Sequence, residues 1–168
     1  LRLWDGASGS DVAVLAKHTM EVNGVRELRD GHLLSWSDDH TLRLWDGASG
    51  SEVAVLEGHT MEVNGARELQ DGHLLSWSRD GTLRLWDAAS RNELAVLTGH
   101  TGFGGVNGAR ELRDGHLLSW SGDGTLWLWD GTNGNKLLVL NNIDNVDGAR
   151  ELRDRRILSW SRDGTLRL

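Results

Sequence analysis

The sequence contains no cysteine, no proline and no tyrosine, and it has a single phenylalanine. Without cysteine the chain can form neither a disulfide framework nor a thiolate metal site. This absence fits a reducing compartment, so we expect a cytoplasmic protein. No apolar run approaches the roughly 20 residues needed to span a bilayer, and no signal peptide opens the chain. We therefore expect no membrane partner.

An excess of basic residues is also missing. The 25 acidic side chains outnumber the 18 basic ones, which gives a formal charge of −7. A basic stripe that could bind phosphates is not expected, so nucleic acid is not the expected partner. The length of 168 residues is that of one ordinary domain.

Tryptophan and glycine, by contrast, are abundant, with 9 and 22 copies. Such a skew is typical of one short unit copied several times. The unit is Asp71–Asp87, DGHLLSWSRDGTLRLWD, and close copies lie at Asp30–Asp46 and Asp114–Asp130. A fourth copy begins at Asp154 and stops early, and its missing end, LRLWD, opens the chain. The start inside the motif suggests a piece of something longer.

Each unit of about 41 residues predicts four short strands. They are expected at Val63–Leu69, Leu74–Ser78, Thr82–Trp86 and Glu93–Leu97 and at matching positions elsewhere, because turn residues separate short apolar or alternating runs. The pair Asp71-Gly72 predicts a two-residue type I′ hairpin turn. Antiparallel strands repeated without helical periodicity indicate an all-β protein.

The units differ in length between the fourth strand of one and the first strand of the next. His100–Gly108 is two residues longer than His59–Gly65, and Asn141–Gly148 is shorter. Length changes belong in loops, so these segments are expected to be loops.

Several linked features resemble the WD-repeat β-propeller family over the whole chain. They are Gly58-His59 at the unit junction, the pattern Leu-Leu-Ser-x-Ser-x-Asp-x-Thr at Leu74–Thr82, and Trp86-Asp87 after the third strand. The resemblance implies propeller blades of four antiparallel strands, a to d from the centre outward. The expected blades are 22–57, 63–98, 106–140, and a split blade of 146–168 with 1–15.

The chain departs from the family pattern in two ways. It has Glu-Leu-Arg-Asp-Gly at the a–b hairpin, where the family commonly has Phe-Ser-Pro-Asp-Gly. A small residue of strand b is replaced by Trp36, Trp77, Trp120 and Trp160. We interpret the two changes as one compensated change, in which an aromatic side chain moves from strand a to strand b and keeps the core volume.

Four blades of this width predict an arc with an apolar face bare at each end, and such patches are rare on soluble monomers. We expect a C2 homodimer with eight blades, in which Leu1–Leu15 of each chain completes the last blade of its partner. The alternatives are a tight four-bladed ring and a fragment of a longer propeller.

Serine, histidine and aspartate recur in each unit, which on paper could be a catalytic set. A nucleophile should be exposed and singular, whereas these sets recur in every blade. In the WD-repeat family the matching residues form a structural hydrogen-bonded tetrad with tryptophan. We therefore expect no catalysis and no enzyme. The expected tetrads are His18/Ser35/Asp39/Trp45, His59/Ser76/Asp80/Trp86, His100/Ser119/Asp123/Trp129, and Ser159/Asp163 with Trp4 but no histidine.

Two other groups of recurring residues, one of histidines and one of Arg-Glu pairs, are candidate binding sites. His32, His73 and His116 follow the Asp-Gly turns, but equivalent positions on neighbouring blades are too far apart to share an ion about 2 Å from each ligand. We expect exposed turn residues, no metal and no cofactor. An Arg-Glu pair also recurs on each innermost strand, as at Arg67-Glu68, and is expected to line a solvated channel or, alternatively, to bind a small molecule or peptide there.

The loops that differ between copies are better candidates for binding. Phe103 stands in a glycine-flanked loop, and Met20 and Met61 occupy the matching loops. In the family such loops line the face that usually binds partners, and a large apolar side chain there is a candidate hot spot. The expected function is a protein-interaction scaffold with a protein or peptide partner on this face. The alternative is a ligand-sensing propeller within a larger multidomain signalling protein.

Overall fold

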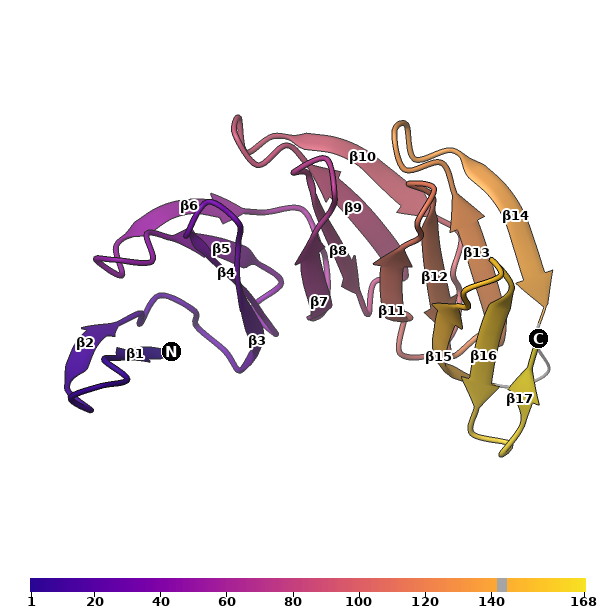
Figure 1. The fold of residues 1–168 in the computed structure, drawn as a ribbon, viewed down its shortest axis with the longest axis horizontal. Helices are drawn as coiled ribbons and strands as arrows, with labels where there is room; N and C mark the ends of the chain where they lie inside the picture. Colours follow the sequence, from indigo (N-terminus) through magenta and orange to yellow (C-terminus); the bar gives the residue numbers. More distant parts are fainter. Residues whose placement is uncertain (142–144) are drawn as a thin grey trace.

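The computed structural model describes residues 1–141 and 145–168, and within them the chain forms strands and turns but no helix (Figure 1). Consequently, none of the described segments is a helix capable of crossing a membrane. The strands are β1 (Arg2–Trp4), β2 (Asp11–Val14), β3 (Val22–Glu27), β4 (Leu33–Ser37), β5 (Leu42–Trp45), β6 (Glu52–Leu56), β7 (Val63–Glu68), β8 (Leu74–Ser78), β9 (Thr82–Trp86), β10 (Glu93–Thr98), β11 (Val106–Glu111), β12 (Leu117–Ser121), β13 (Thr125–Trp129), β14 (Lys136–Asn141), β15 (Val146–Glu151), β16 (Ile157–Ser161) and β17 (Leu166–Arg167).

The strands form three complete antiparallel sheets of four, in the orders β3-β4-β5-β6, β7-β8-β9-β10 and β11-β12-β13-β14. Two partial sheets, β1-β2 and β15-β16-β17, lie at the ends of the chain. This confirms the all-β fold of four-stranded blades. The joint predicted at Asn141–Gly148 includes residues 142–144, which lie outside the described part.

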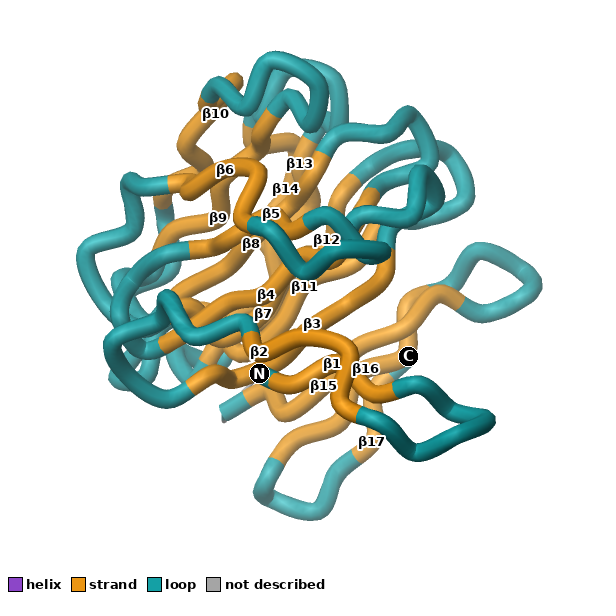
Figure 2. Tube along the Cα trace, turned by 90° about the vertical axis from the view of Figure 1, so that its left-hand side faces the viewer, coloured by secondary structure: helices purple, strands orange, loops and turns teal. Residues whose placement is uncertain are grey.

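The blades follow one another along an open arc. Their first strands, β3, β7, β11 and β15, contact one another on the concave side, and β6, β10 and β14 lie on the convex side (Figure 1). The two termini lie at opposite ends of the arc, so one chain does not close into a four-bladed ring. Seen along the arc, successive blades stack behind one another and the loops project around them (Figure 2).

The core lies between blades rather than within a single sheet. Leu42 and Leu56 of one blade belong to the same buried cluster as Val63 and Trp86 of the next. Alternate residues of a strand point to opposite faces of its sheet, so the second and third complete blades each pack against both neighbours. The repeat therefore specifies the fold only when copies stand side by side.

The a–b hairpins differ from the predicted type I′ turn. Only Gly72 has a positive φ, +95°, whereas a type I′ turn needs positive φ at both central residues. Gly72 N donates to Leu69 O at 3.1 Å, and Leu69 N donates to His73 O at 2.8 Å. These bonds define a three-residue loop with glycine in the left-handed region. The prediction was wrong because Asp-Gly suits this longer loop equally well.

The tryptophans of strand b lie across the glycines of strand a. Trp77 pairs with Gly65 in the β7–β8 ladder, and the other blades repeat this register. Trp36, Trp77 and Trp120 are half-buried against the core clusters, whereas Trp160 in the last, partial blade is 37% exposed. In the complete blades the indoles thus add to the core.

Candidate functional site

The second blade contains a buried chain of four hydrogen-bonded side chains. Trp86 Nε1 donates to Ser76 Oγ at 2.9 Å, and Ser76 Oγ lies 2.8 Å from His59 Nε2. His59 Nδ1 lies 2.9 Å from Asp80 Oδ2. Because the carboxylate can only accept, the imidazole donates to it from Nδ1; in the neutral ring Nε2 is then an acceptor, and the serine hydroxyl donates to it. The chain ties the loop before β7 to the β8–β9 turn and to the end of β9.

The first and third blades repeat this arrangement. His18 lies 2.8 Å from both Ser35 and Asp39, and His100 lies 2.8 Å from Ser119 and 3.2 Å from Asp123. Trp45 and Trp129 each donate to the serine of their own blade at 2.9 Å.

Burial and hydrogen bonds set the protonation states of these groups. Burial alone would raise the pKa of Asp80, but hydrogen bonds from His59, Thr82 and Thr60 outweigh it and hold this pKa well below its usual value. Burial lowers the pKa of His100, although the carboxylate of Asp123 acts in the opposite direction. A neutral imidazole and an ionised carboxylate match the donor order of the tetrad.

The tetrads are poorly suited to nucleophilic catalysis. The serines of the three complete sets are fully buried, and each hydroxyl is already held by an indole and an imidazole. A nucleophile must reach its substrate. We propose that these networks lock the turns of each blade.

The fourth set is not assembled within one chain. Ser159 is buried and Asp163 is exposed in the last blade, whereas Trp4 lies at the other end of the arc and is 54% exposed. Its counterparts Trp45 and Trp86 are only 1% and 2% exposed.

The three candidate residues lie in the loops that lead into equivalent inner strands, and the side chains of all three are exposed to solvent. Phe103 is 98% exposed, and Met20 and Met61 are 58% and 43% exposed. The phenylalanine loop is held by its glycines: Gly105 N donates to Gly102 O at 3.0 Å, and a Cβ at Gly102 would lie 2.3 Å from Asp123 N. The two-residue insertion is thus a tight turn that presents Phe103 instead of tucking it against neighbouring residues.

The histidines after the hairpin turns bind their own turns. The Nδ1 atoms of His32, His73 and His116 lie 3.0, 2.9 and 3.2 Å from the aspartate two residues earlier. No group of three potential metal ligands occurs among residues 1–141 and 145–168.

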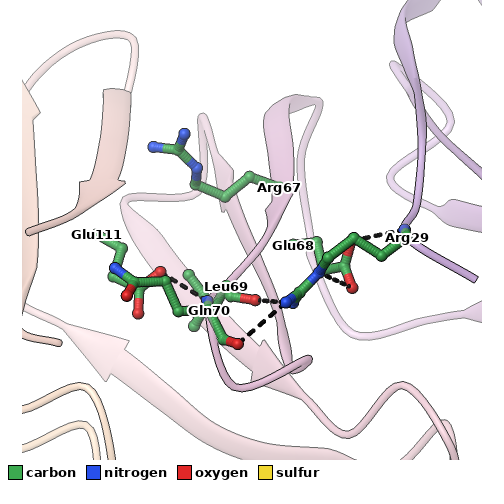
Figure 3. Close-up of a pocket in the computed structure, with 6 residues that line it drawn as sticks. All are labelled: Arg29, Arg67, Glu68, Leu69, Gln70 and Glu111. Carbon is green, nitrogen blue, oxygen red and sulfur yellow. Dashed lines mark hydrogen bonds and ion pairs between the residues drawn. The ribbon is translucent and has the colours of Figure 1, made fainter. Parts of the chain in front are cut away.

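Neighbouring blades are joined near their inner strands by hydrogen bonds that the sequence did not predict. Arg29 donates from its backbone N to Glu68 at 3.0 Å and from Nε at 2.9 Å, and its guanidinium also donates to the carbonyls of Leu69 and Gln70 (Figure 3). These partners are about one repeat apart, so no local pattern reveals them. The backbone-to-glutamate bond recurs at all three joints, as Arg29–Glu68, Gln70–Glu111 and Arg113–Glu151.

Comparison with known proteins identifies the repeat. The family model described as "WD domain, G-beta repeat" matches residues 9–46, 50–87 and 91–130. The chain belongs to the WD-repeat family. Members of this family are generally non-catalytic domains that bind protein partners. A comparison with curated proteins found no match.

Solved WD-repeat and designed proteins share this fold. The WD40 β-propeller domain of Doa1 is 24% identical with a TM-score of 0.78, over 95% of this chain and 54% of that chain. The computationally designed Ika4 protein is 24% identical with a TM-score of 0.81, over 95% of this chain and 96% of that chain. The designed Ika8 protein is 23% identical with a TM-score of 0.84, over 98% of this chain and 50% of that chain. The chain thus spans about half the length of the Doa1 and Ika8 structures.

One WD repeat carries a substitution pair that went unnoticed in the sequence. Where the second blade has an ion pair between Arg84 and Glu93, the third has Trp127 and Lys136. The ammonium of Lys136 lies 4.5 Å from the Trp127 ring centroid, and Trp127 stacks on Trp129 at 5.1 Å. The sequence did contain a signal for this contact, because the two positions depart from the repeat together.

Proposed function

We propose that this WD-repeat chain is a non-catalytic scaffold that binds a protein or peptide partner through the loops entering β3, β7 and β11. The observation that carries this proposal is the exposure of Phe103, 98%, on a loop fixed by glycines. An aromatic side chain has only two χ angles to order on binding, so it loses little entropy there, and such aromatic anchors dominate many interfaces. Met20 and Met61 extend the apolar surface onto the matching loops of the other blades.

The test is a peptide selected against the intact protein from a random library. Phe103→Ser should weaken its binding by about tenfold or more, the range of a hot spot. Leu94→Ser is the matched control, because Leu94 is 51% exposed on the outer strand β10, away from these loops. Equal binding by Phe103→Ser and the original protein, or an equal loss in Leu94→Ser, would refute the loop face.

We further propose that two copies complete one eight-bladed ring. The contacts at the internal joints show what each open end of the arc lacks. Glu27 matches Glu68 and Glu111, but its side chain makes no hydrogen bond or ion pair with any described residue. Likewise, no described residue accepts a hydrogen bond from the guanidinium of Arg153, the counterpart of Arg29 and Arg113. A second copy would bring the Glu27 end of one arc to the Arg153 end of the other.

The apolar surface at the ends supports the same pairing. Leu56 and Leu97 are 2% and 1% exposed, whereas the matching Leu140 is 37% exposed. Leu140, Ile157 and Ser159 line an open cavity of about 580 Å³. We propose that the β1–β2 hairpin of a second copy fills this cavity after displacing β17 from its pairing with β16, and brings its Trp4 to Ser159.

One position of this seam differs from the internal joints. Asn23, Asn64 and Asn107 each donate to a valine carbonyl of the next blade, at 3.0, 2.9 and 2.9 Å. Asp147 stands at the matching place in the last blade and instead accepts from Arg162 at 3.1 Å. A carboxylate cannot donate to a carbonyl, so the seam is expected to be weaker than the internal joints.

A further inference from the structure

The inner strands carry an arginine at the same place in every blade, namely Arg26, Arg67, Arg110 and Arg150. None of these four forms an ion pair within residues 1–141 and 145–168. The glutamates that follow them are engaged differently, because Glu68, Glu111 and Glu151 accept backbone N–H groups of the preceding blade. A chain with a formal charge of −7 thus holds, along the described part of its concave side, a row of arginines that form no ion pair.

The surroundings of Arg67 show that this row is crowded. Its guanidinium points away from Glu68 toward the third blade (Figure 3), and its one hydrogen bond to a described residue goes to Ala109 O at 3.3 Å. Burial first, and then the charges of Arg26 and Arg110, lower the pKa of Arg67, and the charge of Glu111 offsets only part of this. Like charges held together at a partly desolvated place favour an anion, because its charge relieves their repulsion.

Space for such an anion lies beside the row. Arg67 lines an open cavity of about 350 Å³ that also contacts Arg29 of the first blade, Glu68 of the second and Glu111 of the third (Figure 3). A planar guanidinium presents two parallel N–H groups that match a carboxylate. Because the arginine recurs in each blade, acidic side chains of one segment can meet more than one arginine.

We propose that the arginine row Arg26, Arg67, Arg110 and Arg150 binds an acidic peptide segment through its side-chain carboxylates. This site is separate from the Phe103 loop face, so it stands or falls independently of the interaction proposed there. A peptide is favoured over nucleic acid because the chain as a whole is acidic: a long polyanion would meet the negative surface beyond the row, whereas a short segment meets only the row.

The experiment is titration calorimetry of the intact protein with a hexaglutamate peptide at low salt. The triple variant Arg26→Gln, Arg67→Gln, Arg110→Gln should lose at least about tenfold in affinity, and added salt should weaken binding to the original protein. Arg79→Gln is the matched control, because Arg79 pairs with Glu62 outside the row; it should bind as the original protein does.

Three results would overturn the proposal: hexaglutamate binding that the triple variant retains, equal binding of hexalysine, or tighter binding of a single-stranded oligonucleotide than of hexaglutamate. Arg67 donates to a carbonyl, so thermal melting must accompany the titration. If the triple variant melts early, Arg26→Gln alone decides, because no described residue accepts a hydrogen bond from the Arg26 side chain. An unchanged affinity in Arg26→Gln would then refute the row.

Discussion

The indole of Trp77 lies so close over Gly65 that a Cβ atom at position 65 would be 2.2 Å from its ring. Both residues are cross-strand partners in the β7–β8 ladder. The same approach recurs at Gly24, Gly108 and Gly148, where a Cβ would lie 2.3, 2.3 and 2.0 Å from the matching tryptophan. The glycine of strand a and the tryptophan of strand b are therefore one packing unit.

We expect Gly65→Ala to lower the free energy of unfolding by about 1–3 kcal/mol, the usual cost of overpacking. The ring cannot move aside easily, because it packs against the core between two blades. Urea denaturation measures the effect. Gly6→Ala serves as control, since a Cβ there meets nothing within 4 Å; equal stability of the two variants would contradict the packing unit.

We expect His59→Ala to destabilise the protein by about 1–3 kcal/mol, because it removes the buried hydrogen-bond partner that Ser76 and Asp80 share. The comparison variant is His73→Ala, whose side chain is 38% exposed at a hairpin turn and should change stability little. Thermal melting of both variants gives the answer. If both melt with the original protein, the tetrads do not lock the blades.

Stability should fall as the pH drops from about 7.5 to about 5, through the ordinary histidine pKa. Burial lowers the pKa of His100 in the folded protein, so the unfolded chain binds the proton more readily. The contribution of the neutral imidazole is complete above the unfolded pKa and is lost below it. Urea midpoints at both pH values should differ less in His100→Gln; an identical pH dependence would contradict this assignment.

The sequence was sufficient to predict the blade, because the same strand and turn signals recur in all four copies of the unit. It did not reveal which neighbour a side chain meets. A period of two places Trp77 on one face of a strand, but nothing local shows that its ring covers Gly65. Arg29 and Glu68, which join two inner strands, are about one repeat apart and belong to different copies.

The candidate site was likewise only partly predictable from the sequence. The spacing of His59, Ser76, Asp80 and Trp86 led to a family pattern, and the structure places these side chains within hydrogen-bonding distance. The orientation of Phe103 was not predictable, because a glycine-flanked loop can fold inward as easily as outward. Its exposure depends on close approaches of Gly102 to the neighbouring turn, which are tertiary contacts.

The mass in solution tests the central claim, that the blades of two copies complete one ring. Sedimentation equilibrium should give twice the 18.5 kDa of one chain. Trp4→Ala should shift the equilibrium toward the single chain, since it removes the indole proposed to reach Ser159 of the second copy. A species of 18.5 kDa at every concentration would contradict the account.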